Sequence, residues 1–141
     1  MEPLTYTVLG DPIALARPRM SGPNRIIYDS QKLIKHSILN QLIEQHGTRP
    51  QYKGPCHLDV IFYIRAPKVS LVKLQSLIGK PYPFKSDLDN LIKMVCDVAQ
   101  MGDEKEDPGL LLQDDCIVTS ITAKKVYDII PRTVFTITEI K

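Results

Sequence analysis

Two pairs of carboxylates are the side chains most able to do chemistry in this chain. Asp87 and Asp89 stand two residues apart, and Lys93 follows Asp89 after four residues. A second pair, Asp114 and Asp115, comes later, after an apolar run. Carboxylates that converge on one point repel each other unless a cation lies between them, and Mg²⁺ prefers oxygen ligands while keeping several waters. The pattern therefore indicates a site for a hard divalent metal.

The first acidic pair lies at the start of a predicted helix. Apolar residues between 88 and 101 recur at the three- and four-residue spacing of one buried helical stripe. They are Leu91, Ile92, Val95, Val98, Ala99 and Met101. Ser86 or Asp87 can accept the free N–H groups of the first turn, so we expect the helix to begin at one of them.

On this helix Asp89, Lys93 and Asp97 follow one another at four-residue steps and share a charged face. Asp114 and Asp115 precede a predicted strand. Successive side chains of a strand point to opposite faces, so only one of the two can face the helix start. The alternative to a metal site is a capped helix, whose acidic first turn the helix dipole stabilises by roughly 0.3 to 1 kcal/mol per charge.

Length and composition indicate one domain over residues 1–141 with 43% hydrophobic residues, enough for a continuous core. No apolar run approaches the roughly 20 residues of a membrane span and no signal peptide is evident, so we expect a soluble, cytoplasmic protein. The three cysteines and three histidines lack zinc-ligand spacing. No G-x-x-x-x-G-K-[ST] motif occurs, so we expect no use of ATP.

The fold class expected is α+β, with a mixed β-sheet of about four to five strands packed by two main helices. The predicted strands are 4–9, 25–28, 56–65, 116–126 and 133–140, and the other predicted helices are 31–46 and 71–78. We expect the last two strands to form a hairpin. In the first helix the predicted buried stripe is Leu33, Ile34, Ile38, Leu42 and Ile43, with Asp29 or Ser30 as cap and Gly47 as the stop.

The net charge of +2 is unevenly distributed along the chain. Residues 1–85 hold 12 Lys and Arg and 5 Asp and Glu, a balance of +7, whereas residues 86–141 hold 6 and 11, a balance of −5. This asymmetry favours a basic surface for a polyanion beside an acidic pocket for metal. Solvated surface charges without a function are the alternative.

Five basic side chains are the candidates for phosphate contacts: Arg17, Arg19, Lys32, Lys35 and Lys85. The two arginines flank a proline in a predicted loop, and the prolines there hold the backbone stiff. Lys32 and Lys35 are expected near the exposed side of the first helix. In the basic, aromatic segment 80–85, Tyr82 and Phe84 can stack on unpaired bases, although packing in the core is the interpretation we favour for both.

The same segments carry a resemblance to a known family. Residues 87–93 (DLDNLIK), then 112–118 (LQDDCIV) and a lysine pair at 124–125, resemble the RusA family of Holliday junction resolvases. Near the start, residues 10–19 (GDPIALARPR) followed by Tyr28 look like that family's opening strand and Arg-Pro-Arg segment. The chain departs from the family's pattern between 17 and 28, and the loop 102–109 is acidic and long.

The resemblance implies a Mg²⁺-dependent endonuclease, in which Mn²⁺ can substitute, with Asp87, Asp89 and Asp115 as metal ligands. Asp114 would lie behind them, and Lys93 would be the assisting cation. The substrate implied is branched DNA, a four-way junction met in recombination and repair, cut by a homodimer of bacterial or phage origin. The rival functions are a non-catalytic DNA-binding module and a two-metal nuclease acting on flaps, forks or RNA.

Overall fold

The computed structural model describes residues 3–16, 19–22, 26–28, 30–102 and 111–140. The strands are β1 Leu4–Leu9, β2 Arg19–Ser21, β3 Ile26–Tyr28, β4 Cys56–Arg65, β5 Val118–Asp128 and β6 Arg132–Glu139. The helices are α1 Lys32–His46, α2 Leu71–Leu77 and α3 Leu88–Ala99, and a 3-10 turn, η1, covers Asp115–Ile117. A mixed four-stranded sheet in the order β1-β6-β4-β5 forms the body, and β2 pairs with β3 in a separate hairpin. The predicted α+β fold is confirmed.

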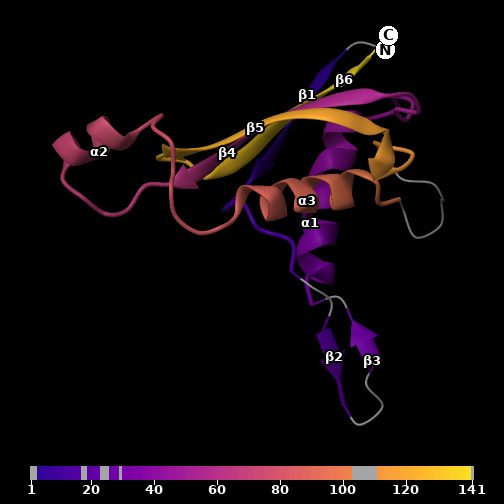
Figure 1. Ribbon diagram of the computed structural model, residues 1–141, viewed down its shortest axis with the longest axis horizontal. Helices are drawn as coiled ribbons and strands as arrows, with labels where there is room; N and C mark the ends of the chain where they lie inside the picture. The colour runs from indigo at the N-terminus through magenta and orange to yellow at the C-terminus, as the bar shows by residue number, and fades with distance from the viewer. Residues whose placement is uncertain (1–2, 17–18, 23–25, 29, 103–110, 141) are drawn as a thin grey trace.

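The core lies between the sheet and the two long helices, which pack on the same side of it (Figure 1). β4 is a central strand, and its Leu58, Val60 and Phe62 are buried while the residues between them are more exposed, the period of two of a strand with one face in a core. The other core positions come from β1, β6 and the helices: Tyr6, Val8, Phe135, Ile137, Leu39, Leu42, Leu91, Met94, Val98 and Ala99.

The hairpin expected between the last two strands is wrong, because β4 lies between them. β4 pairs in parallel with β5 and antiparallel with β6. Since β4 is buried, the N–H and C=O groups along both of its edges need partners, and one neighbour on each side supplies them. The short link 129–131 therefore passes the end of β4 to reach β6.

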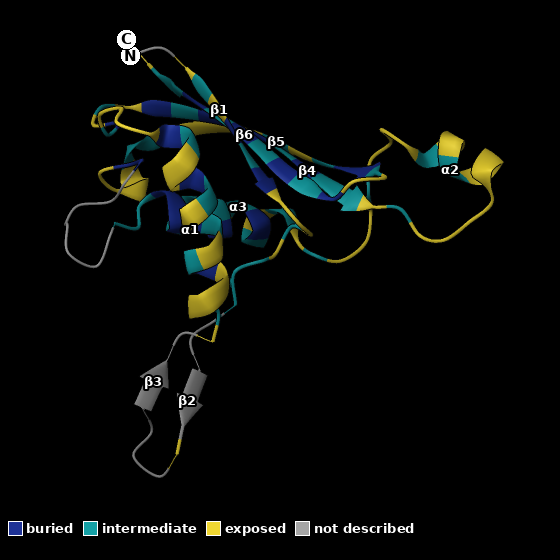
Figure 2. Ribbon diagram, turned by 180° about the vertical axis from the view of Figure 1, so that it is seen from behind, coloured by how far each residue is buried: buried dark blue, intermediate teal, exposed yellow. Residues whose placement is uncertain are grey.

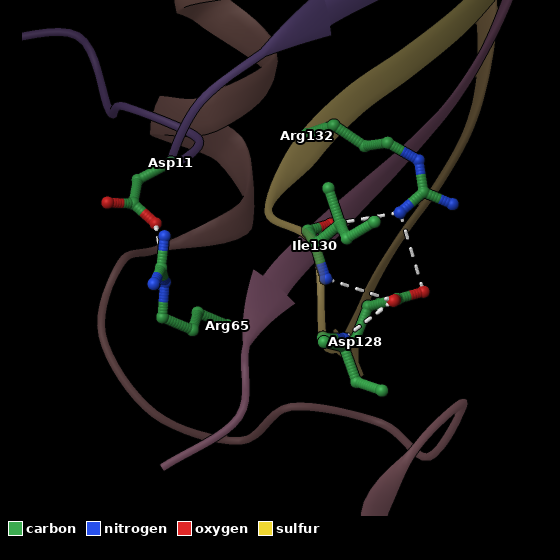
Figure 3. Close-up of polar contacts among 6 residues, drawn as sticks. Asp11, Arg65, Asp128, Ile130 and Arg132 are labelled. Carbon is green, nitrogen blue, oxygen red and sulfur yellow. Dashed lines mark hydrogen bonds and ion pairs between the residues drawn. The ribbon is translucent and has the colours of Figure 1, made fainter. Parts of the chain in front are cut away.

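Asp128 shapes that link, as Figure 3 shows. Its Oδ1 accepts hydrogen bonds from the backbone N–H groups of Ile129 at 2.6 Å and Ile130 at 3.3 Å. Arg132 donates to the carbonyl oxygen of Ile130 at 2.9 Å and lies 3.5 Å from Asp128 Oδ2. An aspartate that bonds its own following backbone is a turn signal, and it fixes this turn without the two strands being neighbours.

The buried face of α1 differs from the predicted stripe. Its buried residues are Lys35, Leu39, Leu42 and His46, whereas Leu33 is 85% exposed and Ile34 and Ile43 are also exposed. Two positions on the buried face, Lys35 and His46, are polar side chains that pair with Asp97 and Tyr6, so hydrophobicity alone selects the wrong face. The helix stops at Gly47 as predicted, with φ 62°, but its N-cap is Gln31 rather than Ser30; Asp29 lies outside the described residues.

The remaining predicted elements are confirmed apart from their ends. α3 begins directly after Asp87, as expected, and α2 is a short helix. The strand predicted from Cys116 begins at Val118 because η1 takes the residues before it. Most of the loop 102–109 lies outside the described residues. Within the described ranges, none of the helices has the length and apolar character needed to cross a membrane.

Candidate active site

The segment that leads into α3 is fastened to the edge of β5. Backbone hydrogen bonds join residues 79–82 to Lys125 and Tyr127 near the end of that strand. Lys125 Nζ then donates to the carbonyl oxygens of Phe84 and Ser86, each at 2.7 Å. These bonds hold the backbone immediately before Asp87. The sequence offers no local signal for this role of Lys125, because its two acceptors lie 41 and 39 residues away.

Asp87 and Asp89 stand at the exposed start of α3. Asp87 is the N-cap residue but its side chain makes no capping hydrogen bond. Asp89 Oδ2 lies 3.9 Å from Lys93 Nζ, with 71% and 61% of the two side chains exposed. An exposed ion pair at this distance contributes little to stability, typically below about 1 kcal/mol. The capped-helix alternative therefore leaves the Asp87 carboxylate without a structural use.

Lys93 also lines a cavity of about 430 Å³ along the side of α3. Asp97 from the same helix and Asp115 from η1 line it too, together with Cys96. Its apolar walls are Leu15, Ile92, Val118 and Ile121. The structure thus brings Lys93 and Asp115 to one cavity, while Asp87 and Asp89 lie outside its lining.

Within the described ranges, no three Asp, Glu, His or Cys side chains form a group that could enclose a metal ion. A second cavity, of about 320 Å³, lies between α1, α3 and the loop after β1. Its lining is mainly apolar and contains a single carboxylate, Asp11. Of these two cavities, the one beside α3 therefore carries more of the ionisable side chains.

The second acidic pair forms a turn rather than the start of a strand, because Asp114 Oδ1 accepts the N–H of Cys116 at 3.2 Å. Gln100 Oε1 accepts the N–H of Asp115 at 3.1 Å and ties the turn to the end of α3. The hydrogen bond from Cys116 lowers the pKa of Asp114. The hydrogen bond with Asp114, partial desolvation, and repulsion from Asp114 and Asp97 raise the pKa of Asp115. Negative charge is thus crowded at the cavity.

Asp97 holds a partner from the other long helix. Lys35 Nζ of α1 lies 2.8 Å from Asp97 Oδ2, with 11% of the lysine side chain and 33% of the aspartate side chain exposed. The expectation that Lys35 lies near the exposed side of α1 is wrong. Lys35, Leu39, Leu42 and His46 follow the three- and four-residue spacing of one helical face, but two of the four are polar, so hydrophobicity did not single this face out. Asp97 was placed on the charged face of α3 but given no role.

A comparison with family models gives the decisive match: the model described as endodeoxyribonuclease RusA covers residues 10–138. This chain belongs to the RusA family. The match spans both acidic segments and most of the sheet, so the RusA-family chain is an endodeoxyribonuclease. A search of curated proteins finds no match.

Of the phosphate candidates in this RusA-family chain, Lys32 and Lys85 are exposed. Arg17 lies outside the described residues, and only the backbone of Arg19 is described, in β2. The N–H of Leu15 donates to the carbonyl oxygen of Asn90 at 3.0 Å, so the loop that leads to Arg17 lies against the first turn of α3. The described chain up to Ala16 therefore passes beside the start of α3.

The two aromatic residues before α3 differ in environment. Tyr82 is half-buried and packs edge-on against Tyr127, with ring centroids 4.9 Å apart. Phe84 is 63% exposed, so the core interpretation is wrong for it. The centroid of its ring lies 5.6 Å from that of Tyr82.

Proposed function

We propose that this RusA-family endodeoxyribonuclease is a Mg²⁺-dependent resolvase of four-way DNA junctions that acts in recombination and repair as a homodimer. The observation that carries the proposal is the cavity beside α3, where Lys93 and Asp115 meet and where Asp89 is linked through Lys93. This arrangement puts an ammonium beside crowded carboxylates. These are functional groups suited to hydrolysis of a phosphodiester.

The donor set fits a hard divalent cation. Mg²⁺ binds through one or two carboxylates and retains waters, so a closed protein cage is not required. A hydrogen bond with Asp114, desolvation, and repulsion from Asp114 and Asp97 raise the pKa of Asp115, and a bound cation would relieve that repulsion. Asp115, Asp89 and Asp87 would hold the ion, and Mn²⁺, which also suits carboxylate and water ligands, can substitute. When bound, the ion supplies a water of lowered pKa and neutralises charge on the phosphate.

The other residues position these groups. Lys93, exposed and only 3.9 Å from Asp89, can reach a phosphate oxygen and stabilise charge that develops on it during cleavage. Gln100 holds the backbone of Asp115, and Lys125 holds the backbone before Asp87. Each acidic segment therefore has its own anchor to the folded body.

A four-way junction presents two symmetry-related strands for cutting. A two-fold dimer of this chain would place one site at each strand. Dimerisation is tested by sedimentation equilibrium with and without junction DNA. A chain that stays monomeric while cutting both strands would contradict this part of the proposal.

The experiment that tests the function compares cleavage of a four-way junction, a flap, a fork, a duplex and an RNA hairpin at equal concentrations. We expect paired cuts in the junction with Mg²⁺ or Mn²⁺ and none in EDTA. Asp59→Asn, at an exposed carboxylate on β4, is the matched control for Asp115→Asn. Equal cutting of flaps and junctions would contradict junction selectivity, and cutting in EDTA would contradict the metal requirement.

A further inference from the structure

The ion pair between Lys35 and Asp97 joins the two long helices at the cavity. It is short, 2.8 Å, and the lysine side chain is only 11% exposed. Its exposed counterpart on α3, the pair of Asp89 and Lys93, spans 3.9 Å with both side chains mostly in solvent. The two pairs therefore differ in how firmly each carboxylate is held.

Burial of the lysine gives the pair weight. Removing an ammonium from water is costly unless a carboxylate compensates for it, and Asp97 supplies a carboxylate oxygen 2.8 Å from the ammonium. Asp97 nevertheless lines the cavity together with Asp115. The charge of Asp97 at the cavity is thus neutralised by Lys35, which belongs to the other long helix, α1.

We propose that Lys35 is a positioning residue that sets the cation affinity of the cavity: it neutralises Asp97 and holds this carboxylate against α1, so that the ion is bound by Asp115 and the start of α3. The inference rests on the proposed function in one respect, the presence of a cation at Asp115. It assigns Lys35 to the metal site rather than to phosphate binding.

Direct Mn²⁺ binding to the full chain without DNA, followed by electron paramagnetic resonance at pH 8, tests the proposal. Lys35→Met keeps a long side chain but leaves Asp97 as an uncompensated charge, so Mn²⁺ should bind several-fold more tightly than to the wild type. Lys35→Met combined with Asp97→Asn removes both charges and should return the affinity close to the wild-type value. Lys35→Arg, which keeps the charge, should also stay close to it.

A merely structural pair gives a different result. Lys35→Met would then lower the melting temperature while its Mn²⁺ affinity stayed at the wild-type value, and this outcome would overturn the proposal. Absence of Mn²⁺ binding to the wild type would overturn the metal site and the role of Lys35 together. Tighter binding by Lys35→Met in an enzyme that fails to prefer junctions would support the proposal while contradicting the proposed function.

DNA binding in EDTA supplies a second readout, the dependence of affinity on salt. Lys32→Met, at a lysine on the exposed side of α1, is the matched control with which Lys35→Met is compared. A buried ammonium releases no counterion, so Lys35→Met should leave the slope of log affinity against log salt unchanged. Each phosphate contact contributes about −0.9 to that slope for duplex DNA. A slope reduced by this amount in Lys35→Met would place Lys35 on phosphate and overturn the assignment.

Discussion

The helices α3 and α2 stand in opposite relations to the body of the molecule. α3 buries Leu91, Met94, Val98 and Ala99 against the sheet and α1. α2 buries none of its residues, and Leu71 and Val72 are 68% and 78% exposed. Figure 2 shows the contrast, with α2 on an arm away from the body. The packed helix can hold reacting groups in fixed places, whereas the helix on the arm can only extend the reach of the molecule.

The charges follow the same division. The arm consists of residues 66–86 and includes α2. It carries Lys68, Lys73, Lys80 and Lys85 and no Asp or Glu. The packed helix carries Asp89 and Asp97 on its charged face, and Asp97 lines the cavity together with Asp115. We therefore expect changes in α3 to act on chemistry and stability, and changes in the arm to act on DNA affinity.

The largest effect should come from the carboxylates. Asp87→Asn, Asp89→Asn and Asp115→Asn should each lower Mg²⁺-dependent cleavage by about a hundredfold or more, because a metal ion supplies several kcal/mol of transition-state stabilisation. Stability should not fall for Asp115→Asn, since the raised pKa of Asp115 means that the folded chain disfavours its charge. Single-turnover cleavage and melting temperature decide this. Near-wild-type cutting by any of the three would remove that residue from the metal site.

The next largest effect should be a difference in stability between substitutions in α3 and substitutions in α2. Leu91→Ala in α3 removes a fully buried side chain and should cost about 2 to 5 kcal/mol of unfolding free energy. Leu71→Ala in α2 removes an exposed side chain and should stay within about 0.5 kcal/mol of the wild type. Urea denaturation of both variants gives the two values. Equal costs would mean that α2 packs against something in solution and would break the comparison.

Acid should destabilise the packed body through His46. Burial lowers the pKa of this histidine from its ordinary value of 6.5. Below pH 6.5 the unfolded chain takes up a proton that the folded chain resists, so stability present at neutral pH is lost as the pH falls toward the lowered folded pKa. Urea midpoints at pH 7.5, 6.5 and 5.5 measure this loss. His46→Gln should flatten the dependence and His57→Gln should not; an unchanged dependence in His46→Gln would contradict the assignment.

The smallest effect should come from the arm. Lys73→Ala should reduce the salt slope of junction binding by about 0.9 per phosphate contact, while cleavage at saturating enzyme stays unchanged. Lys53→Ala, at an exposed lysine before β4, is the control and should change neither quantity. Binding titrations from low to moderate salt test the pair. Equal slopes for Lys73→Ala and the wild type would take the arm out of the DNA interface.

Local patterns predicted the elements well and their partners poorly. The periodicity of α3 and the alternation along β4 are strong because both elements bury one apolar face. The buried face of α1 was misplaced because Lys35 and His46 belong to it, and a buried charge is intelligible only once Asp97 is known to face it. The order of β5, β4 and β6 depends on which strand is central, and no turn signal carries that information.

The candidate site shows the same limit. The acidic pairs and Lys93 could be singled out as candidates because residue types at short spacing suffice to suggest metal chemistry. Lys125 was noted only within the lysine pair of the resemblance and Gln100 not at all, because each acts through a contact with backbone far away in the chain. Phe84 was assigned to the core because aromatic residues are usually buried there, whereas its segment is held by its backbone and leaves the ring outside.

The strand β5 sets the spacing between the two acidic segments. Asp115 stands just before it, and Lys125 within it clasps the backbone that leads to Asp87. The spacing between the segments thus depends on the length of this one strand and not on the loop that joins the segments in sequence. Insertions in 103–110 leave this spacing intact, whereas a single residue added between 118 and 124 would turn Lys125 to the other face of the sheet and release the start of α3.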